Sequence, residues 1–246
     1  MSRFRVALGC LTILPVGPQG TVPPADLGGS FAWFPLVGLL VGAALAGIPI
    51  LAAPALPPLV VGAWVLLAWV LLTGALHLDG VGDVADGLYA GRTPADRLRI
   101  MKDPHIGAVG VVAVTLVLIL KFALLSSLPS AALARAVLVV PCLGRYVMVV
   151  LGTTLPYARA EDGTAAAFVR HGSPRALAPA SLVAGLAAGL AFGARGLWLI
   201  AVGLAGSLLL RAGFRRALGG ITGDALGAAG EVSEVLLLAA IAAMAR

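Results

Sequence analysis

Three aspartates, Asp79, Asp83 and Asp86 (the aspartate cluster), lie within eight residues, directly after an apolar run long enough to cross a membrane. On a helix, steps of four and three residues bring their side chains onto one face. Three carboxylates this close repel one another unless a cation lies among them. A hard divalent ion such as Mg²⁺, with a phosphorylated substrate as a further ligand, supplies that charge. The spacing therefore predicts metal-dependent phosphate chemistry at a membrane surface.

A second acidic group lies near the C-terminus, where Asp224, Glu231 and Glu234 follow a glycine-rich stretch at 219–223. Spacings of seven and three residues allow these carboxylates to share a helical face. Glutamates in the opening turns of a membrane span are costly to bury and usually functional. We therefore predict two acidic walls of one site. Asp224 would be a further metal ligand, and Glu231 and Glu234 would complete the metal site or bind substrate.

Residues suited to phosphate binding follow the aspartate cluster. Arg97 and Arg99 carry guanidinium groups that can bind phosphate through two hydrogen bonds, and Lys102 adds an ammonium charge. Together with the adjacent Asp103, they are predicted to bind substrate. His77, directly before the cluster, is a candidate catalytic base or hydrogen-bond donor. A histidine that only hydrogen-bonds the backbone is an equally good interpretation of His77.

Composition places these residues in a membrane protein. Of the 246 residues, 60% are hydrophobic and 11% are charged, and the mean hydropathy is +1.04. Soluble domains carry about 25% charged residues. We therefore expect an all-α, polytopic membrane bundle formed by one domain, 1–246. The net charge of +6 comes from basic residues between apolar spans, so membrane topology explains it and nucleic acid is not an expected partner.

The apolar runs predict about seven transmembrane spans, with six or eight as alternatives because prolines interrupt several of them. The glycines Gly185, Gly189 and Gly193 share one face and predict close helix packing there. The expected spans are 31–53, 59–76, 106–125, 133–151, 177–192, 197–210 and 226–245.

The charged residues gather on one side of these spans. Segments 1–30, 77–105, 152–176 and 211–225 contain 12 of the 17 Lys and Arg residues and nine of the 11 acids. Short loops rich in Lys and Arg face the cytoplasm. The sequence therefore predicts that any chemistry takes place at the cytoplasmic face.

Several motifs resemble the cobalamin synthase family. The stretch 73–80, Thr-Gly-Ala-Leu-His-Leu-Asp-Gly, with Ala-Asp-Gly at 85–87, is similar to the aspartate signature of that family. The segments Ile-Met-Lys-Asp at 100–103 and Thr-Gly-Asp at 222–224 continue the resemblance, which spans nearly the whole chain. Gly82 stands where alanine is expected, and Pro-His at 104–105 is also a departure. Neither removes a carboxylate.

The resemblance implies an enzyme of late vitamin B12 synthesis in the inner membrane of a bacterium. Its members join adenosylcobinamide-GDP to α-ribazole, or to α-ribazole 5′-phosphate, and release GMP. Mg²⁺ would be the cofactor, bound by the aspartate cluster and Asp224. The general base would be an aspartate such as Asp83, or else His77. Membrane lipids are expected around the spans. A homo-oligomer is a possible assembly that the sequence does not decide.

Two other interpretations remain. A CDP-alcohol phosphotransferase would also displace a nucleoside monophosphate, but its signature has Asp-Gly-x-x-Ala-Arg, whereas Val81, Gly82 and Asp83 follow Asp79-Gly80 here. A transporter would place ionisable residues near the midplane of several spans. Product formation in detergent, where no gradient exists, separates transport from catalysis.

Overall fold

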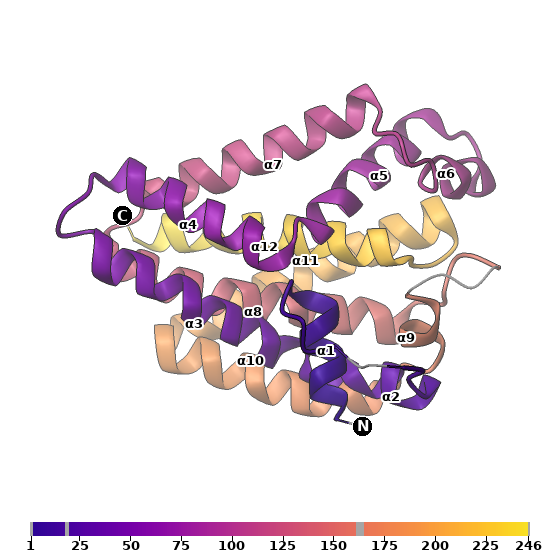
Figure 1. The fold of residues 1–246 in the computed structure, drawn as a ribbon, viewed down its shortest axis with the longest axis horizontal. Helices are drawn as coiled ribbons and strands as arrows, with labels where there is room; N and C mark the ends of the chain where they lie inside the picture. Colours follow the sequence, from indigo (N-terminus) through magenta and orange to yellow (C-terminus); the bar gives the residue numbers. More distant parts are fainter. Residues whose placement is uncertain (1, 18–19, 161–164, 246) are drawn as a thin grey trace.

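The computed structural model describes residues 2–17, 20–160 and 165–245, and helices dominate these ranges (Figure 1). Within them, β-pairing is limited to one parallel bridge between Tyr157 and Ile221. The α-helices are α1 (Arg3–Leu11), α2 (Pro24–Gly29), α3 (Phe34–Ala52), α4 (Pro58–Thr73), α5 (Leu76–Ala90), α6 (Pro94–Ile100), α7 (Ala108–Ser127), α8 (Ser130–Thr154), α9 (Ala166–Arg170), α10 (Leu177–Phe192), α11 (Arg195–Leu218) and α12 (Gly223–Met244), and the 3-10 helices are η1 (Ser30–Trp33) and η2 (Pro174–Ala176).

The apolar helices confirm the prediction of a polytopic all-α bundle. Among the described residues, six helical stretches are long and apolar enough to cross a membrane, and a seventh span arises if the bent pair α4 and α5 is counted as one. Helix α10 matches the expected span 177–192, whereas α11 covers Arg195–Leu218, where only 197–210 was expected. Polar residues near helix ends lower the local hydropathy although the backbone stays helical.

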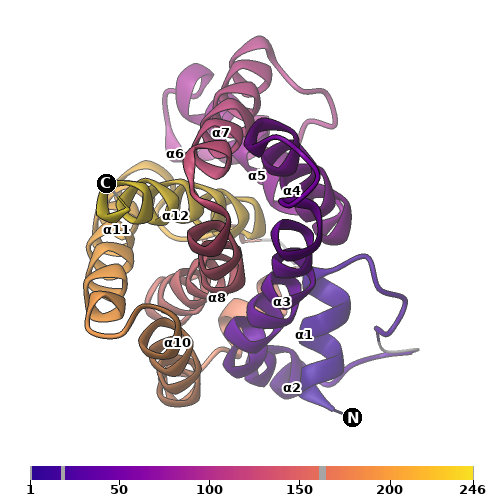
Figure 2. The same cartoon turned by 90° about the vertical axis from the view of Figure 1, so that its left-hand side faces the viewer.

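Helix α8 forms the centre of the bundle and contacts α3, α10, α11 and α12 (Figure 2). Glycines let α3 approach it closely. A Cβ atom on Gly38 would lie 2.4 Å from the carbonyl oxygen of Pro141, and one on Gly42 would lie 2.2 Å from that of Leu138. Small residues at such crossings allow close backbone packing, which stabilises helix pairs within a lipid environment.

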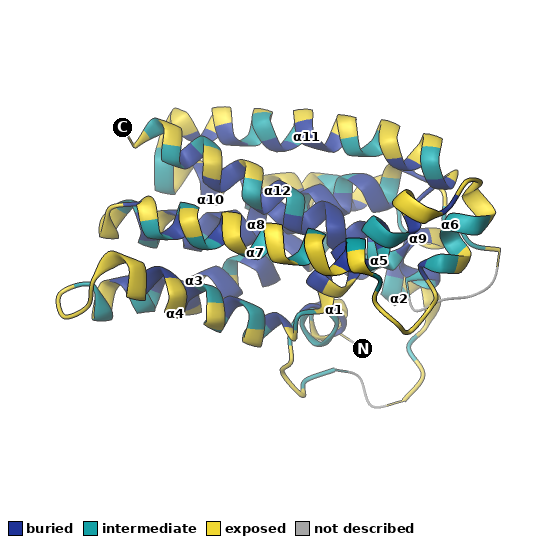
Figure 3. Ribbon diagram, turned by 90° about the horizontal axis from the view of Figure 1, so that it is seen from above, coloured by how far each residue is buried: buried dark blue, intermediate teal, exposed yellow. Residues whose placement is uncertain are grey.

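Exposed residues cover the outer faces of α4, α7 and α11 (Figure 3). Many are large and apolar, including Leu67, Leu116 and Leu209, as a lipid-facing surface requires. The predicted close packing at Gly185 and Gly189 of α10 is wrong within this chain, because no described atom lies within 4 Å of a Cβ built on either glycine.

A sharp bend separates α4 from α5. The axes of the two helices differ by 86°, and the chain turns at Gly74 and Ala75, which have φ values of 61° and 55°. Glycine adopts this left-handed conformation freely, whereas alanine pays roughly 1–2 kcal/mol. Ala75 is the one non-glycine residue with positive φ in the described chain. The bend lets α5, which carries the aspartate cluster, pack against α7 and α12.

The polar segments gather at one end of the bundle. In Figure 1, α2, α6 and α9 lie at the right-hand end, whereas the α3–α4 turn and the C-terminus lie at the left-hand end. Helix α6 begins with a capping box in which the Thr93 hydroxyl accepts from the backbone N–H of Asp96 and the Asp96 carboxylate accepts from that of Thr93. The fold thus gathers these segments at the end of the bundle toward which α5 runs, where α6 contacts α5 (Figure 1).

Candidate functional site

The candidate site forms where α5 crosses α12. A Cβ atom on Gly80 would lie 2.5 Å from the backbone oxygen of Asp224, and one on Gly227 would lie 3.1 Å from the Cα atom of His77. A glycine on each helix therefore permits the close approach. The crossing brings Asp224, one member of the predicted second acidic wall, beside the aspartate cluster.

Replacing Gly80 with alanine is expected to lower the free energy of unfolding by about 1–3 kcal/mol, because the added methyl group forces the two backbones apart. The matched control is Gly213→Ala on α11, where no described atom lies within 4 Å of the added Cβ. That change should be neutral or stabilise the helix by up to about 1 kcal/mol. Thermal unfolding of both variants in detergent measures the difference. Equal midpoints would contradict the close crossing.

The aspartates at the crossing have distinct surroundings. Asp79 is exposed and lines a cavity of about 220 Å³ together with Asp224. Asp83 is half-buried. The negative charges of Asp224 and Asp79 act on its carboxylate, and the positive charge of Arg159 opposes their effect. Asp224 lies in the first turn of α12, whose N-cap Thr222 accepts a hydrogen bond from the backbone of Ala225.

Asp86 differs from the other cluster members. Its Oδ2 atom accepts a hydrogen bond of 2.7 Å from the backbone N–H of Gly107, and Oδ1 accepts one of 2.8 Å from that of Gly110. Both donors belong to the start of α7, where backbone N–H groups lack partners within the helix. The negative charge also suits the positive end of the helix dipole. Asp86 thus holds α7 against α5, and its predicted metal contact stays a prediction.

The sequence did not single out Arg159, yet this residue lies within the site. Its Nη2 atom donates a 2.8 Å hydrogen bond to Oδ2 of Asp224. The bridge between Tyr157 and Ile221 fixes the two segments side by side, with Ala158 N–H donating to the carbonyl oxygen of Ile221 at 2.9 Å. No sequence pattern marks this contact, because it joins residues 65 positions apart.

The predicted phosphate-binding residues separate into two groups. Arg99 and Lys102 border one cavity of about 410 Å³ together with Arg159. Arg97 instead donates to the carbonyl oxygens of Gly91 and Ala217 at 3.1 and 2.9 Å, which attaches α6 to the end of α11.

Asp103 lies apart on an exposed turn with His105. The backbone N–H of His105 and its ring Nδ1 lie 3.0 and 2.8 Å from Oδ1 of Asp103. Both hydrogen bonds lower the pKa of the Asp103 carboxyl, and the bond from the backbone N–H has the larger effect. A role in substrate binding stays a prediction for Asp103.

Glu231 and Glu234 lie deeper, in a buried ionic network with Lys121 and Arg145. Lys121 Nζ lies 2.6 Å from Glu231, and it also binds Glu234. Arg145 forms a hydrogen-bonded ion pair with Glu234, and both side chains are fully buried. Lys121 and Arg145 lie within the apolar helices α7 and α8, and the structure pairs both with these acids. The two cations balance the two carboxylates, as burial requires.

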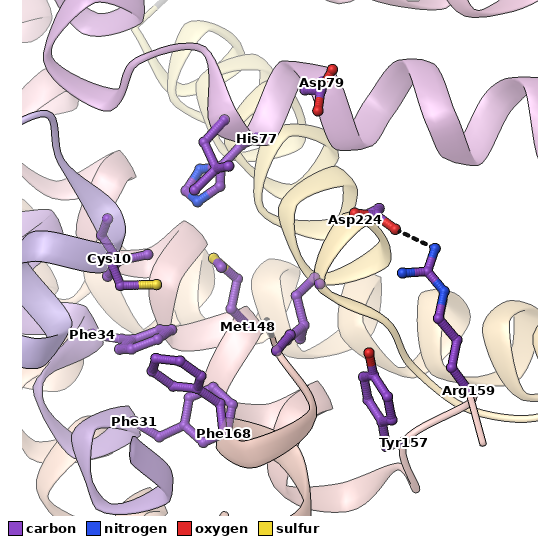
Figure 4. A pocket seen from close by; sticks show the side chains of 15 residues that line it. Cys10, Phe31, Phe34, His77, Asp79, Met148, Tyr157, Arg159, Phe168 and Asp224 are labelled. Atoms are coloured by element: carbon purple, nitrogen blue, oxygen red, sulfur yellow. Dashed lines mark hydrogen bonds and ion pairs between the residues drawn. The ribbon is translucent and has the colours of Figure 1, made fainter. Parts of the chain in front are cut away.

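His77 connects this network with the cavity. Its Nδ1 atom lies 3.3 Å from Nη2 of Arg145, and the side chain lines the cavity that contains Asp79 and Asp224. In Figure 4 the imidazole ring lies between Asp79 on one side and Cys10 and Met148 on the other. His77 therefore belongs to the cavity wall as well as to the network.

The carboxylates suit a metal ion that also needs substrate ligands. Among the described residues, no three acidic, thiol or imidazole side chains form a complete binding group for a metal. Magnesium in phosphate-transfer sites is usually held by one or two carboxylates, water and substrate phosphates. Asp79, Asp83 and Asp224 offer hard oxygen ligands of this kind, so the donor set fits Mg²⁺ better than a metal that needs a full protein cage.

Comparison with known proteins identifies the family. The sequence model of the cobalamin-5-phosphate synthase family matches residues 3–242. A protein of Syntrophobacter fumaroxidans, named adenosylcobinamide-GDP ribazoletransferase, is 39% identical over 99% of both chains. Proteins with the same name from Pseudomonas paraeruginosa and Chlorobium chlorochromatii are 42% and 40% identical over 98% and 93% of this chain, and 98% and 91% of theirs. No solved structure matches.

These matches cover almost every residue of the chain, including the α5–α12 crossing and its aspartates. They confirm the resemblance that the motifs at 73–87, 100–103 and 222–224 indicated. The chain belongs to the cobalamin-5-phosphate synthase family.

Proposed function

We propose that this protein is an adenosylcobinamide-GDP ribazoletransferase that acts at the cytoplasmic face of a bacterial inner membrane. The observation that carries the proposal is the crossing of α5 and α12, which places Asp79 and Asp83 beside Asp224 and Arg159. Relatives with this printed name share about 40% of their residues over nearly the whole chain.

The proposed reaction replaces a phosphoanhydride bond to GMP with a phosphate ester bond to ribazole. The 3′-hydroxyl oxygen of α-ribazole, or of its 5′-phosphate, attacks the phosphorus atom that is attached to cobinamide. A P–O bond to this hydroxyl forms, the bridging P–O bond to GMP breaks, and the hydroxyl proton passes to a base. Asp83 is the candidate base, since it lies half-buried among the acidic side chains of the crossing.

Asp79, Asp83 and Asp224 would hold Mg²⁺, and Asp86 is a further predicted ligand on α5 whose carboxylate also accepts hydrogen bonds from the start of α7. When bound, the metal supplies positive charge for the diphosphate and for the leaving GMP. Arg159 orients Asp224 through its 2.8 Å hydrogen bond. The protein thus contributes by positioning the reactants and neutralising charge.

Arg99, Lys102 and Arg159 would bind the diphosphate of the donor, because they border the same cavity beside the crossing. A guanidinium binds two phosphate oxygens at once, and an ammonium contributes a point charge. Arg97 would act indirectly, by fixing α6 to α11. The direct role of Arg99 and the indirect role of Arg97 thus both require that α6 packs beside the site.

The orientation in the membrane rests on charge. The segments that carry the site are also those that contain most of the Lys and Arg residues, and such segments remain in the cytoplasm. The nucleotide substrate is available on that side. A cysteine placed in the exposed 102–105 turn should react with a membrane-impermeant maleimide only after spheroplasts are opened, once the two native cysteines have been changed to alanine.

The test of the proposed function is turnover by the purified protein in detergent. Adenosylcobinamide-GDP, α-ribazole and Mg²⁺ should give GMP and adenosylcobalamin in equal amounts. No gradient exists in detergent, so product formation also excludes a purely transporting role. Absence of product from a monodisperse protein, with turnover of a CDP-alcohol substrate instead, would overturn the proposal.

Removal of divalent metal is expected to abolish this turnover. Excess EDTA should reduce GMP release to background, because the acidic crossing would then repel the diphosphate. Added Mg²⁺ beyond the EDTA concentration should restore the rate. An unchanged thermal midpoint in EDTA would show that the fold does not require the metal. Full turnover in EDTA would contradict the assignment of the metal site.

A further inference from the structure

The cavity at the α5–α12 crossing has a polar mouth and an apolar interior (Figure 4). Asp79 and Asp224 lie at the mouth, whereas the rings of Phe31, Phe34 and Phe168 lie together at the far end. The proposed chemistry takes place at the carboxylates and leaves this aromatic interior without a role. A volume of about 220 Å³ suits a small aromatic group and is far too small for a corrin macrocycle.

The aromatic interior is rigidly held. The rings of Phe31 and Phe34 meet edge to face with centroids 4.9 Å apart, and each has its centroid 6.2 Å from that of Phe168. A Cβ atom on Gly152 would lie 2.6 Å from Cζ of Phe31, so this glycine makes room for the ring. Phe34 and Phe168, which are 3% and 7% exposed, thus offer fixed apolar surface to a flat aromatic ligand at little entropic cost.

His77 supplies a hydrogen-bond donor to this cavity. Arg145 has only N–H donors, so the Nδ1 atom of His77, 3.3 Å from Nη2, must accept. We therefore assign the ring proton of the neutral imidazole to Nε2. No hydrogen bond joins Nε2 to another residue of the described chain, and the residue lines the cavity. The cavity thus combines an apolar aromatic wall with a donor suited to a ring nitrogen.

We infer that this cavity binds the benzimidazole base of the acceptor nucleoside, with its ring nitrogen facing Nε2 of His77 and its ribose toward Asp79 and Asp224. The inference rests on the proposed function and names the position of one substrate within that site. Benzimidazole attached to ribose has one unsubstituted ring nitrogen, which accepts a hydrogen bond. This arrangement directs the 3′-hydroxyl to the carboxylates and makes His77 a binding residue instead of a base.

The guanine base of the donor is the main competitor for the cavity. Guanine carries several N–H groups and a carbonyl oxygen on its edge, and burying each without a partner costs about 1–3 kcal/mol. The far end offers Phe31, Phe34 and Phe168, which supply no such partners, whereas the polar side chains of Tyr157 and Arg159 lie on the side of Asp224 (Figure 4). The benzimidazole base therefore fits the lining better.

Binding of α-ribazole without the donor tests the inference. Equilibrium dialysis of labelled α-ribazole against purified protein in detergent should show saturable binding. Unlabelled α-ribazole should compete for this binding, whereas guanosine and ribose 5-phosphate should not. Phe168→Leu should weaken this binding about tenfold, which is about 1.4 kcal/mol and within the range for aromatic stacking on a base. Phe192→Leu, at the end of α10 and outside the cavity, is the matched control.

A second variant distinguishes the loss of the binding site from a folding defect. Cys10→Phe adds a ring at the half-buried wall of the cavity without removing any aromatic contact, and it should also weaken α-ribazole binding. In turnover, both variants should raise the KM for α-ribazole about tenfold, leave the KM for adenosylcobinamide-GDP unchanged and keep kcat within about twofold.

The outcomes separate the two proposals. Product formation by wild type, with unchanged α-ribazole affinity in both cavity variants, would overturn the base site while the proposed function stands. Competition by guanosine would assign the cavity to the donor and also overturn the inference. Failure of the wild type to form product, with turnover of a CDP-alcohol instead, would overturn the proposed function itself.

Discussion

Asp83→Asn is expected to reduce GMP release by at least about 10²-fold in the presence of saturating Mg²⁺. The change keeps the shape of the side chain and removes one negative charge from the centre of the acidic crossing. Asp83 lies among Asp79, Asp86 and Asp224, so its charge contributes to any cation bound there. Asparagine is also unable to accept the hydroxyl proton of the acceptor.

The loss should not come from unfolding. Removing one of several like charges relieves repulsion, so the thermal midpoint of Asp83→Asn should equal or exceed that of wild type. The control is Asp26→Asn, which alters the surface pair with Arg3 and should leave turnover unchanged. Wild-type turnover by Asp83→Asn would overturn the metal and base assignments together, whereas loss of turnover in Asp26→Asn would show that the assay reports general damage.

Glu234→Gln is expected to destabilise the fold more than any single change at the site. It leaves Arg145 buried with no carboxylate partner, since Glu231 pairs with Lys121. Breaking a buried pair in this way costs about 3–5 kcal/mol. For a chain of this size the thermal midpoint should fall by about 6–20 °C. Temperature-dependent loss of monodisperse protein in detergent measures the shift.

The double variant Arg145→Met with Glu234→Gln separates charge balance from packing. It removes one positive and one negative charge, so the remaining pair of Lys121 and Glu231 stays neutral. The double variant should recover most of the stability lost in Glu234→Gln, because no unpaired charge remains buried. A double variant as unstable as the single one would show that shape, and not charge balance, decides the stability of this network.

The sequence by itself determined the class of the fold and the position of the main motif. Hydropathy over about 20 residues reports a membrane span because the lipid interior excludes polar side chains. The steps from Asp79 to Asp83 and Asp86 report a shared helical face because neighbouring turns of one helix have fixed geometry. Both signals depend on local sequence, so they can be interpreted without knowledge of how the helices pack. The family also followed from the sequence, since its motifs extend along the whole chain.

The partners of the acidic residues were decided only by the tertiary structure. Asp86 binds the start of α7, Glu234 binds Lys121 and Arg145, and Asp224 binds Arg159. Each contact joins segments that are distant in the chain, so no local periodicity predicts it.

Two features of the backbone position α5 for its contacts. The 86° bend at Gly74 and Ala75 turns α5 out of the direction of α4, and the glycines at the crossing let α5 lie against α12. A shared helical face predicted that the three aspartates would act together. The packing gives the members different surroundings, since Asp86 accepts hydrogen bonds from a helix end whereas Asp79 lies at the cavity mouth, and the joint metal contact stays a prediction.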